Sequence, residues 1–185
     1  MSIETVLYAL QNDSSVLLPY PIHESAFLIP STIPFSAEVR KACEANLCGM
    51  YGKCWTCPPG VGLWEELREH YHSYAHAFVF TTVHPLEDSY DIEGMTEGRK
   101  QHTDAERAIE KLLFAEAEPF AICGAEGCSL CEKCTYPNAP CRHPELAHHS
   151  MEATGIHVVT LAADCGIHYH NGVNTVTYFS IIFWL

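Results

Sequence analysis

The chain carries the stretch Cys128-Ser-Leu-Cys131-Glu-Lys-Cys134-Thr-Tyr-Pro-Asn-Ala-Pro-Cys141-Arg-His-Pro144. Its spacing is C-x2-C-x2-C-x6-C-R-x-P, so three cysteines recur at a constant interval and a fourth follows a proline-containing loop. Bacterial ferredoxins use the same C-x2-C-x2-C run to hold a [4Fe-4S] cluster, followed there by C-x3-C-P. The wider x6 gap departs from that pattern. It leaves open whether Cys141 binds the same cluster or a neighbouring one.

Zinc is the main alternative for this stretch, because C-x2-C pairs also form zinc ribbons. Zinc sites usually combine two such pairs separated by about a dozen residues or more, and a triple run fits that arrangement poorly. Disulfides would need an oxidising compartment, and nothing in the sequence indicates one. We therefore predict iron–sulfur ligation and keep zinc as the alternative.

A second cysteine-rich segment lies earlier in the chain and reads Cys43-Glu-Ala-Asn-Leu-Cys48-Gly-Met-Tyr-Gly-Lys-Cys54-Trp-Thr-Cys57-Pro-Pro-Gly60. Its glycines and prolines predict an irregular loop. The two segments contain eight of the ten cysteines, and Cys123 and Cys165 lie outside them. All four cysteines of this segment, Cys43, Cys48, Cys54 and Cys57, are candidate ligands, and the spacing alone does not decide which of them bind metal.

Composition limits the classes of partner and compartment. The formal charge of −13, from 23 acidic and 10 basic residues, argues against nucleic-acid binding, which needs clustered Lys and Arg. The N-terminus shows no signal-type apolar core, and the apolar run at 178–185 is too short to cross a bilayer. We expect a cytoplasmic protein with reduced thiols and no membrane contact. Its expected partner is a redox protein or a small-molecule ligand, and exposed clusters would favour a low-oxygen cell.

Hydrophobic periodicity and capping signals predict an α/β protein. The pattern predicts helices over 36–46, 63–74, 103–117 and 144–154, strands over 77–83, 120–123 and 156–162, and short strands near 6–9 and 15–18. The helix at 103 rests on a capping box, Thr103-Asp-Ala-Glu106, and the stretch 84–102 is expected to be a loop or a weak helix. Asn171-Gly172 predicts an antiparallel hairpin between 167–170 and 173–183.

Strands that alternate with helices imply βαβ units and a mainly parallel sheet, to which the C-terminal hairpin adds an antiparallel part. The 185 residues, 48% of them hydrophobic, suffice for one domain over 1–185, with cysteine-rich metal-binding segments at 43–57 and 128–141. The second segment leaves a predicted strand and enters a predicted helix. That is where α/β sheets place ligand sites.

Helix starts follow both segments in this prediction, Leu63 after Cys57 and Pro144 after Cys141. Free amides at a helix start would stabilise an anionic cluster. Arg142 has two equally good interpretations: it offsets cluster charge or binds an anionic substrate, or it pairs with a carboxylate such as Glu145. Among the twelve histidines, surface positions are the main expectation. The candidates for tuning or proton supply are His143, His148, His149, His168 and His170.

The two segments resemble an uncharacterised prokaryotic family described as predicted metal-binding proteins, a domain of unknown function. The first signature includes Val39-Arg40, Cys43, Cys48, Tyr51-Gly52-Lys53, Trp55 and Cys57-Pro-Pro. The second includes Cys128, Cys131, Cys134, Cys141-Arg-His-Pro-Glu145 and Glu152-Ala-Thr-Gly155. The resemblance covers about residues 36 to 183 and implies metal binding without an established reaction. Cys54, Cys123 and Cys165 lie outside its pattern.

These patterns lead to three functional expectations. If Cys54 is not a ligand, three thiolates hold the first cluster and one iron is open to a small ligand or substrate, whereas the second cluster is closed and suited to electron transfer. If Cys54 is a ligand, both clusters are closed and a simple two-cluster electron carrier is the better interpretation. The third expectation is a zinc-stabilised binding module. The pattern leaves open whether the protein is an enzyme.

Overall fold

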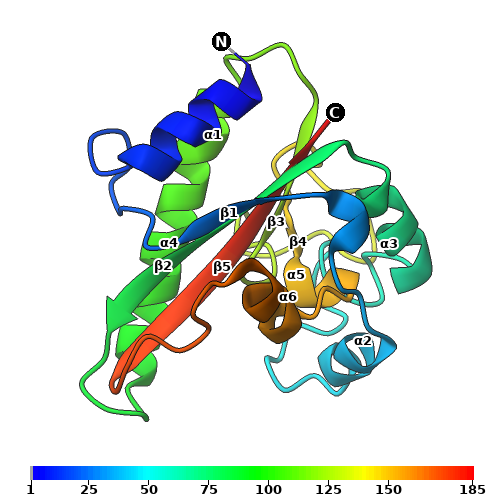
Figure 1. The fold of residues 1–185 in the computed structure, drawn as a ribbon. Helices are drawn as coiled ribbons and strands as arrows, with labels where there is room; N and C mark the ends of the chain where they lie inside the picture. Colours follow the sequence, from blue (N-terminus) through cyan, green and yellow to red (C-terminus); the bar gives the residue numbers. More distant parts are fainter. Residues whose placement is uncertain (1) are drawn as a thin grey trace.

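A five-stranded sheet runs through the middle of the computed structural model, which describes residues 2–185, and helices cover both of its faces (Figure 1). The elements in chain order are α1 (Ile3–Asn12), β1 (Ser25–Leu28), a 3-10 turn η1 (Pro30–Thr32), α2 (Ala37–Glu44), α3 (Trp64–His72), β2 (His76–Pro85), α4 (Ile92–Leu113), β3 (Phe120–Gly124), β4 (His149–Ser150), α5 (Met151–Thr154), α6 (Val158–Cys165) and β5 (Thr175–Trp184).

The sheet is mixed, so the expected mainly parallel sheet is wrong, although the α/β class is confirmed. The strand order is β1-β2-β5-β3-β4. The pairs β1–β2, β2–β5 and β3–β5 are antiparallel, and β3–β4 is parallel. The expected C-terminal hairpin is also wrong, because residues 167–170 form no strand and β5 instead lies between β2 and β3.

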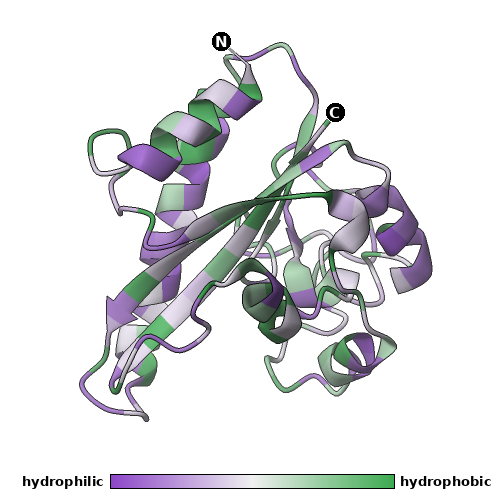
Figure 2. Ribbon diagram, viewed as in Figure 1, coloured by the Kyte–Doolittle hydropathy of each residue, from purple (hydrophilic) through white to green (hydrophobic). Residues whose placement is uncertain are grey.

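The two longest strands, β2 and β5, form the centre of the sheet. They pair along their full length, with Phe80 opposite Ser180 and Phe78 opposite Ile182. Both strands are rich in apolar residues, and Figure 2 accordingly shows green segments along them between paler ones. Such a composition is usual where helices bury both faces of a strand. The sequence of β2 therefore predicted its burial correctly without revealing its direction.

Alternate residues of these strands enter two separate cores. On one face, Phe78, Phe80 and Ile182 pack with residues of α1 and α4. On the other face, Val79, Ile181 and Phe183 pack with residues of α3, α5 and α6. Figure 1 shows the same division, with α1 and α4 on one side of the sheet and α2, α3, α5 and α6 on the other.

The long helix α4 begins eleven residues before the predicted helix start at Thr103. Its N-cap is Asp91, whose carboxylate accepts a hydrogen bond from the Gly94 amide. Thr103 lies inside the helix and donates its hydroxyl to the Arg99 carbonyl, so the capping box does not operate. Gly98 lowers the helical propensity, but it allows close packing: a Cβ there would lie 2.9 Å from His84.

Other local expectations also changed. Residues 6–9 belong to helix α1, whose buried face consists of Ile3, Val6, Leu7 and Leu10 at helical spacing. The predicted strand at 156–162 is mostly helix α6, which the side chain of His157 caps by accepting from the Thr160 amide. The helices at 36–46 and 63–74 and the strand at 120–123 are confirmed within a few residues.

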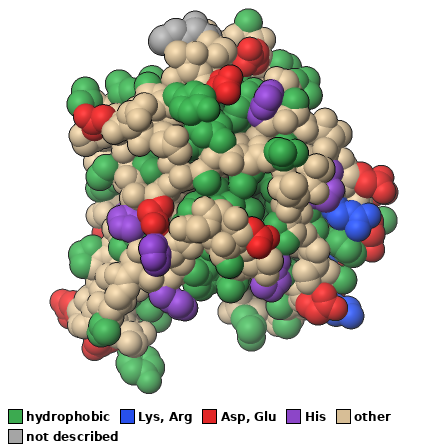
Figure 3. Space-filling model, viewed as in Figure 1, with side chains coloured by type: hydrophobic (Ala, Val, Ile, Leu, Met, Phe, Trp, Pro, Cys, Tyr) green, Lys and Arg blue, Asp and Glu red, His purple; other side chains and the backbone are tan. Residues whose placement is uncertain are grey.

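The surface drawn in Figure 3 carries acidic and histidine side chains spread among apolar ones, whereas Lys and Arg appear near one margin. Of the helices formed by residues 2–185, none combines the length and the apolar character needed to span a bilayer.

Candidate metal centre

The first cysteine segment leaves the end of α2 and folds back on itself in tight turns. Asn46, Gly49 and Gly52 adopt positive φ angles of 59°, 74° and 69°, which glycine and asparagine tolerate best. The Gly52 amide donates to the Pro58 carbonyl at 2.8 Å, closing the loop. The turns bring the end of α2 and the Cys57-Pro-Pro stretch to one place, although the sequence between them has no regular structure.

Three cysteines of this segment, Cys43, Cys48 and Cys57, line one cavity of about 390 Å³, which we call the first cavity. The rest of its wall is largely apolar, and it comes from α2, the loop after it, and residues 125–127. Two carboxyl groups, Glu126 and Glu152, complete it. The three predicted ligands of the first site therefore face a shared, largely apolar space that also contains two carboxyl groups.

The second cysteine segment forms a loop closed by its own backbone. The Thr135 hydroxyl donates to the Pro140 carbonyl at 2.8 Å, and Arg142 Nη1 donates to the Lys133 carbonyl at 2.9 Å. Arg142 thus closes the loop, and it also lines the cavity of the predicted cysteine ligands. Its role in offsetting cluster charge or binding an anionic substrate stays a prediction. The predicted ligands of this segment line a narrow cavity together, namely Cys128, Cys131, Cys134 and Cys141, with His143 beside them.

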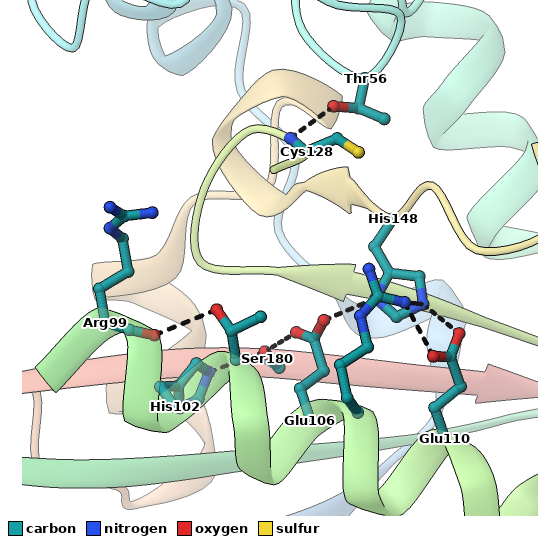
Figure 4. Close-up of polar contacts among 10 residues, drawn as sticks. Thr56, Arg99, His102, Glu106, Glu110, Cys128, His148 and Ser180 are labelled. Atoms are coloured by element: carbon teal, nitrogen blue, oxygen red, sulfur yellow. Dashed lines mark hydrogen bonds and ion pairs between the residues drawn. The ribbon is translucent and has the colours of Figure 1, made fainter. Parts of the chain in front are cut away.

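The two segments contact each other, which the sequence did not reveal. The Cys128 amide donates to Thr56 Oγ1 at 3.0 Å, as Figure 4 shows. Trp55 Nε1 donates to the Ala139 carbonyl at 3.1 Å. At Gly127 a Cβ would lie 2.8 Å from Cys57 Sγ. Glycine is therefore required there, because any side chain would displace a predicted ligand.

Cys54 lies on the side of the second segment. It lines a cavity of about 510 Å³ with Cys128, Cys131 and Cys134, and it is absent from the lining of the first cavity. Its Sγ is 3.4 Å from Thr56 Oγ1. A hydrogen bond with Cys57 lowers the pKa of the Cys54 thiol to about 5, and the same bond raises the pKa of Cys57. Of the two, Cys54 is therefore the better thiolate.

The cysteines surround cavities and do not converge on one point. Within residues 2–185, no group of three His, Cys, Asp or Glu side chains is placed so that it could hold a single metal ion. A zinc ion needs its thiolates about 2.3 Å from one atom. A [4Fe-4S] cubane is bound differently, because each thiolate binds a different iron and the ligands enclose a volume. The donor set and its arrangement fit a cluster better than a lone ion.

The expected helix starts beside the ligands are only partly present. α3 begins at Trp64, close to the prediction, after a turn in which the Val61 amide donates to the Cys57 carbonyl. The expected helix at Pro144 is wrong. Residues 144–146 form a turn, and α5 begins at Met151 with Ser150 as its N-cap and ends before Gly155, which has a left-handed conformation. No helix start follows Cys141 directly within the described chain.

The histidine candidates separate in space. His168 and His170 lie on a loop, and His168 Nδ1 is 2.8 Å from Glu24 Oε1. His148 and His149 lie at β4 and its edge, not in a helix. His149 Nδ1 is 2.8 Å from the Tyr71 hydroxyl, and burial lowers the pKa of His149 to about 4.

His148 is held between two carboxylates of α4 (Figure 4). Its Nδ1 is 2.5 Å from Glu106 Oε1, and its Nε2 is 2.6 Å from Glu110 Oε1. Burial opposes the charge of His148, but the two carboxylates outweigh it and raise the pKa of the ring. The pKa values of Glu106 and Glu110 are lowered although burial opposes this, because His148 hydrogen-bonds to both. The sequence signal was the four-residue spacing of His102, Glu106 and Glu110, which places them on one helix face.

The raised pKa of His148 gives a pH-dependent stability. Its stabilising contribution is complete below the ordinary histidine pKa of about 6.5 and is lost as the pH rises through the folded value. The contribution of Glu106 and Glu110 is complete above about pH 4.5 and is lost as the pH falls through their lowered values. We therefore expect His148→Gln to destabilise the protein most between about pH 4.5 and 6.5. Urea unfolding of both proteins from pH 4 to 9 measures this, and a difference that is constant with pH would contradict it.

The comparisons with known proteins agree with a metal centre. A family model described as predicted metal-binding protein (DUF2284) matches residues 26–184. No curated protein matches the chain, and no solved structure does. The matched range contains both cysteine-rich segments and all the strands except the first residue of β1.

Proposed function

Because the chain belongs to this family of predicted metal-binding proteins, we propose that its two cysteine-rich segments bind two [4Fe-4S] clusters. Cys43, Cys48 and Cys57 hold the first cluster through three thiolates, so that one iron is open to a small ligand or substrate. Cys128, Cys131, Cys134 and Cys141 hold the second cluster through four thiolates, and it transfers electrons.

The observation that carries this proposal is the division of the thiols between cavities. Three of the four cysteines of the first segment, Cys43, Cys48 and Cys57, share one cavity. The four cysteines of the second segment share another. Cys54 lines a cavity with members of the second group. This grouping supports a first site with three thiolates, since the fourth cysteine of its segment lines the neighbouring cavity.

The surroundings of the first cavity indicate which ligand it would admit. The wall contains Val39, Ala42, Leu47 and Met50, which favour a small, weakly polar molecule. The Glu152 carboxyl lies in the same wall and accepts from Ser150 Oγ at 2.9 Å. Burial raises its pKa, so this side chain is suited to donating a hydrogen bond to a bound ligand. A bound cluster would supply one-electron transfer and a Lewis-acidic iron.

A closed two-cluster electron carrier is the second candidate. The lowered pKa of Cys54, about 5, favours a thiolate there, and a thiolate is the form that binds metal. In this case Cys54 becomes a ligand when a cluster is present, and no iron stays open.

Anaerobic purification followed by metal and sulfide analysis tests the proposal. We expect about eight irons and about eight sulfides per chain, with a brown colour and a paramagnetic signal on reduction. A colourless protein with zinc and no sulfide would contradict the proposal and identify a zinc-stabilised module instead, because Zn²⁺ is d¹⁰ and has no redox chemistry.

A further inference from the structure

A chain of hydrogen-bonded, buried polar side chains runs between α4 and the sheet. Its outer end lies away from both cysteine cavities. His84 Nε2 is 2.8 Å from Thr82 Oγ1, and the same oxygen is 2.8 Å from His102 Nδ1. His102 Nε2 is 2.8 Å from Ser180 Oγ. The sheet supplies Thr82, His84 and Ser180, and α4 supplies His102. Each of these side chains is at least nine-tenths buried.

The chain continues toward the cysteine-rich loop. Ser180 Oγ donates to Glu106 Oε2 at 2.5 Å, and the other oxygen of Glu106 meets His148 Nδ1 at 2.5 Å. His148 Nε2 then meets Glu110 at 2.6 Å. Figure 4 shows His102, Glu106 and Glu110 projecting from α4 in a row, with Ser180 and His148 between them. An unbroken line of hydrogen-bonding groups therefore crosses the interior.

The hydrogen bonds of Gln101, at the outer end of the chain, determine which atom donates and which accepts in the contacts that follow. Gln101 Nε2 donates to Glu97 Oε1 at 3.1 Å, so Gln101 Oε1 is the atom that faces His84 Nδ1 at 3.0 Å. His84 must therefore donate from Nδ1 and, when neutral, accept at Nε2 from the Thr82 hydroxyl. Thr82 then accepts from His102 Nδ1. The neutral His102 ring can then only accept a hydrogen bond at Nε2, from the Ser180 hydroxyl. The single hydrogen of that hydroxyl also faces Glu106, so one hydrogen has to serve two contacts.

The chain is consequently one proton short. Five contacts link Gln101 to Glu106. Only four hydrogens are available to them, one each from His84, Thr82, His102 and Ser180, when both rings are neutral and Glu106 is ionised. A fifth proton completes all the contacts equally well on His84, on His102 or on Glu106. Moving the proton among these sites only reverses the hydroxyls of Thr82 and Ser180, and no contact is broken.

The two ends of the chain open in different places. At the outer end, Gln101 is half-buried and Glu97 is exposed. At the inner end, His148 lines a cavity of about 300 Å³ whose wall includes Pro144 and Glu145 of the cysteine-rich loop. His148 and Glu106 also line a smaller cavity with Cys128. Protons that reach His148 therefore arrive beside the second predicted cluster site.

We propose that this chain is a proton relay from the surface at Gln101 to the cavities beside the cysteine-rich loop. Before inward transfer the four hydrogens reverse from their resting directions, so that His84 Nε2, Thr82, His102 Nε2 and Ser180 donate toward Glu106 and His84 Nδ1 is free to take a proton from bulk water. Each hydrogen then moves one contact inward, and the Ser180 hydrogen passes to Glu106. His148 gives its Nε2 proton to Glu110, which releases it into the cavity, so the number of protons in the chain is unchanged after each transfer. The relay rests on the proposed function in one respect: the electrons come from the clusters. The substrate class is then a small molecule that takes up a proton when it is reduced.

Other charged and titratable groups surround the relay, and they set its resting state. Burial lowers the pKa of His102 to about 4, so the fifth proton is absent at neutral pH and enters only during transfer. The neighbouring groups are Arg99 and Arg107 of α4, Tyr178 of β5, Cys123 of β3, Glu126 of the following loop and His149 of β4.

The first test uses the metal-free protein and nitrogen NMR of labelled histidine rings during a pH titration. We expect His84 and His102 to take up one shared proton with a common midpoint in the wild type. Thr82→Val should separate the two midpoints, and Thr82→Ser, which keeps the hydroxyl, should restore the common one. Thr81→Val is the matched control, because Thr81 is buried on the same strand and its hydroxyl bonds to the Glu24 backbone and not to the polar chain. Independent midpoints in the wild type would overturn the relay.

The second test uses protein loaded with its metal and follows proton uptake after rapid reduction with a pH-indicator dye. We expect Thr82→Val and Ser180→Ala to slow the uptake by about tenfold or more, as loss of a positioned proton donor does, and Thr81→Val to leave it unchanged. Uptake at the wild-type rate in both variants would overturn the relay. If the protein takes up no metal, the proposed function fails, whereas the NMR titration still decides the relay.

Discussion

Replacing Cys131 by serine is expected to remove about half of the bound iron and sulfide, because one of two four-iron clusters is lost. Cys131 lines both cavities of the second segment, so no other cysteine replaces it without moving the loop. Cys57→Ser should remove the other half. Iron and sulfide analysis after anaerobic purification measures both losses.

Two further variants make this result specific. Cys165→Ser is the matched control, because Cys165 ends α6 outside both segments, and it should keep all the iron. Cys54→Ser distinguishes the two candidate functions: full iron content supports a three-thiolate first site, whereas loss of a cluster supports the closed carrier. Undiminished iron in both Cys57→Ser and Cys131→Ser would show that these ligand sets are wrong.

Replacing Arg40 by methionine is expected to lower the free energy of unfolding of the metal-free protein by about 2–4 kcal/mol. Arg40 is only 7% exposed. It donates to the Ala153 carbonyl at 2.9 Å and to the Gly62 carbonyl at 2.8 Å, so its loss leaves two carbonyls without their partner. Its ion pair with Glu44 adds little, because Glu44 is half-exposed. Urea unfolding at pH 7 measures the change.

The neighbouring residue Lys41 supplies the control. It is exposed on the same helix, and Lys41→Met should change the free energy of unfolding by less than about 0.5 kcal/mol. Arg40 connects α2 to α5 and to the loop after Cys57, and α2 and α5 both contribute residues to the wall of the first cavity. We therefore expect Arg40→Met also to lower the occupancy of the first cluster. Wild-type stability for this variant would show that the connection does not support the fold.

Several elements were predictable because their signals are local. Ser36 at a helix start, the apolar spacing before Tyr71 and the apolar run of β2 each depend on neighbours within a few residues, and all three appear as expected. Gly155 also adopts the left-handed conformation that glycine commonly takes after a helix end, with a φ of 94°. Helix ends and buried strands follow from propensity and capping, which act over one or two turns.

The errors arose where packing outweighed local preference. The stretch before Thr103 contains Gly94 and Gly98 and was expected to be a loop or a weak helix, and α4 runs through its second half as a continuous helix. Gly98 fits because the helix lies against His84 of β2. The hairpin signal at Asn171-Gly172 failed for a similar reason: β5 gains more by pairing with β2 and β3 than with the short segment before the turn.

The sequence by itself determined the chemical character of this protein: two groups of thiols at metal-binding spacing, an excess of acidic residues and an α/β chain with a buried central strand. These follow from residue types and from spacings along the chain. Only the tertiary structure decided that the sheet is mixed, that Cys54 lies with the second segment, and that Ser180 and His148 meet the row of polar side chains on α4. These depend on contacts between residues far apart in the sequence, whose energies are set by which surfaces pack together and not by any local pattern.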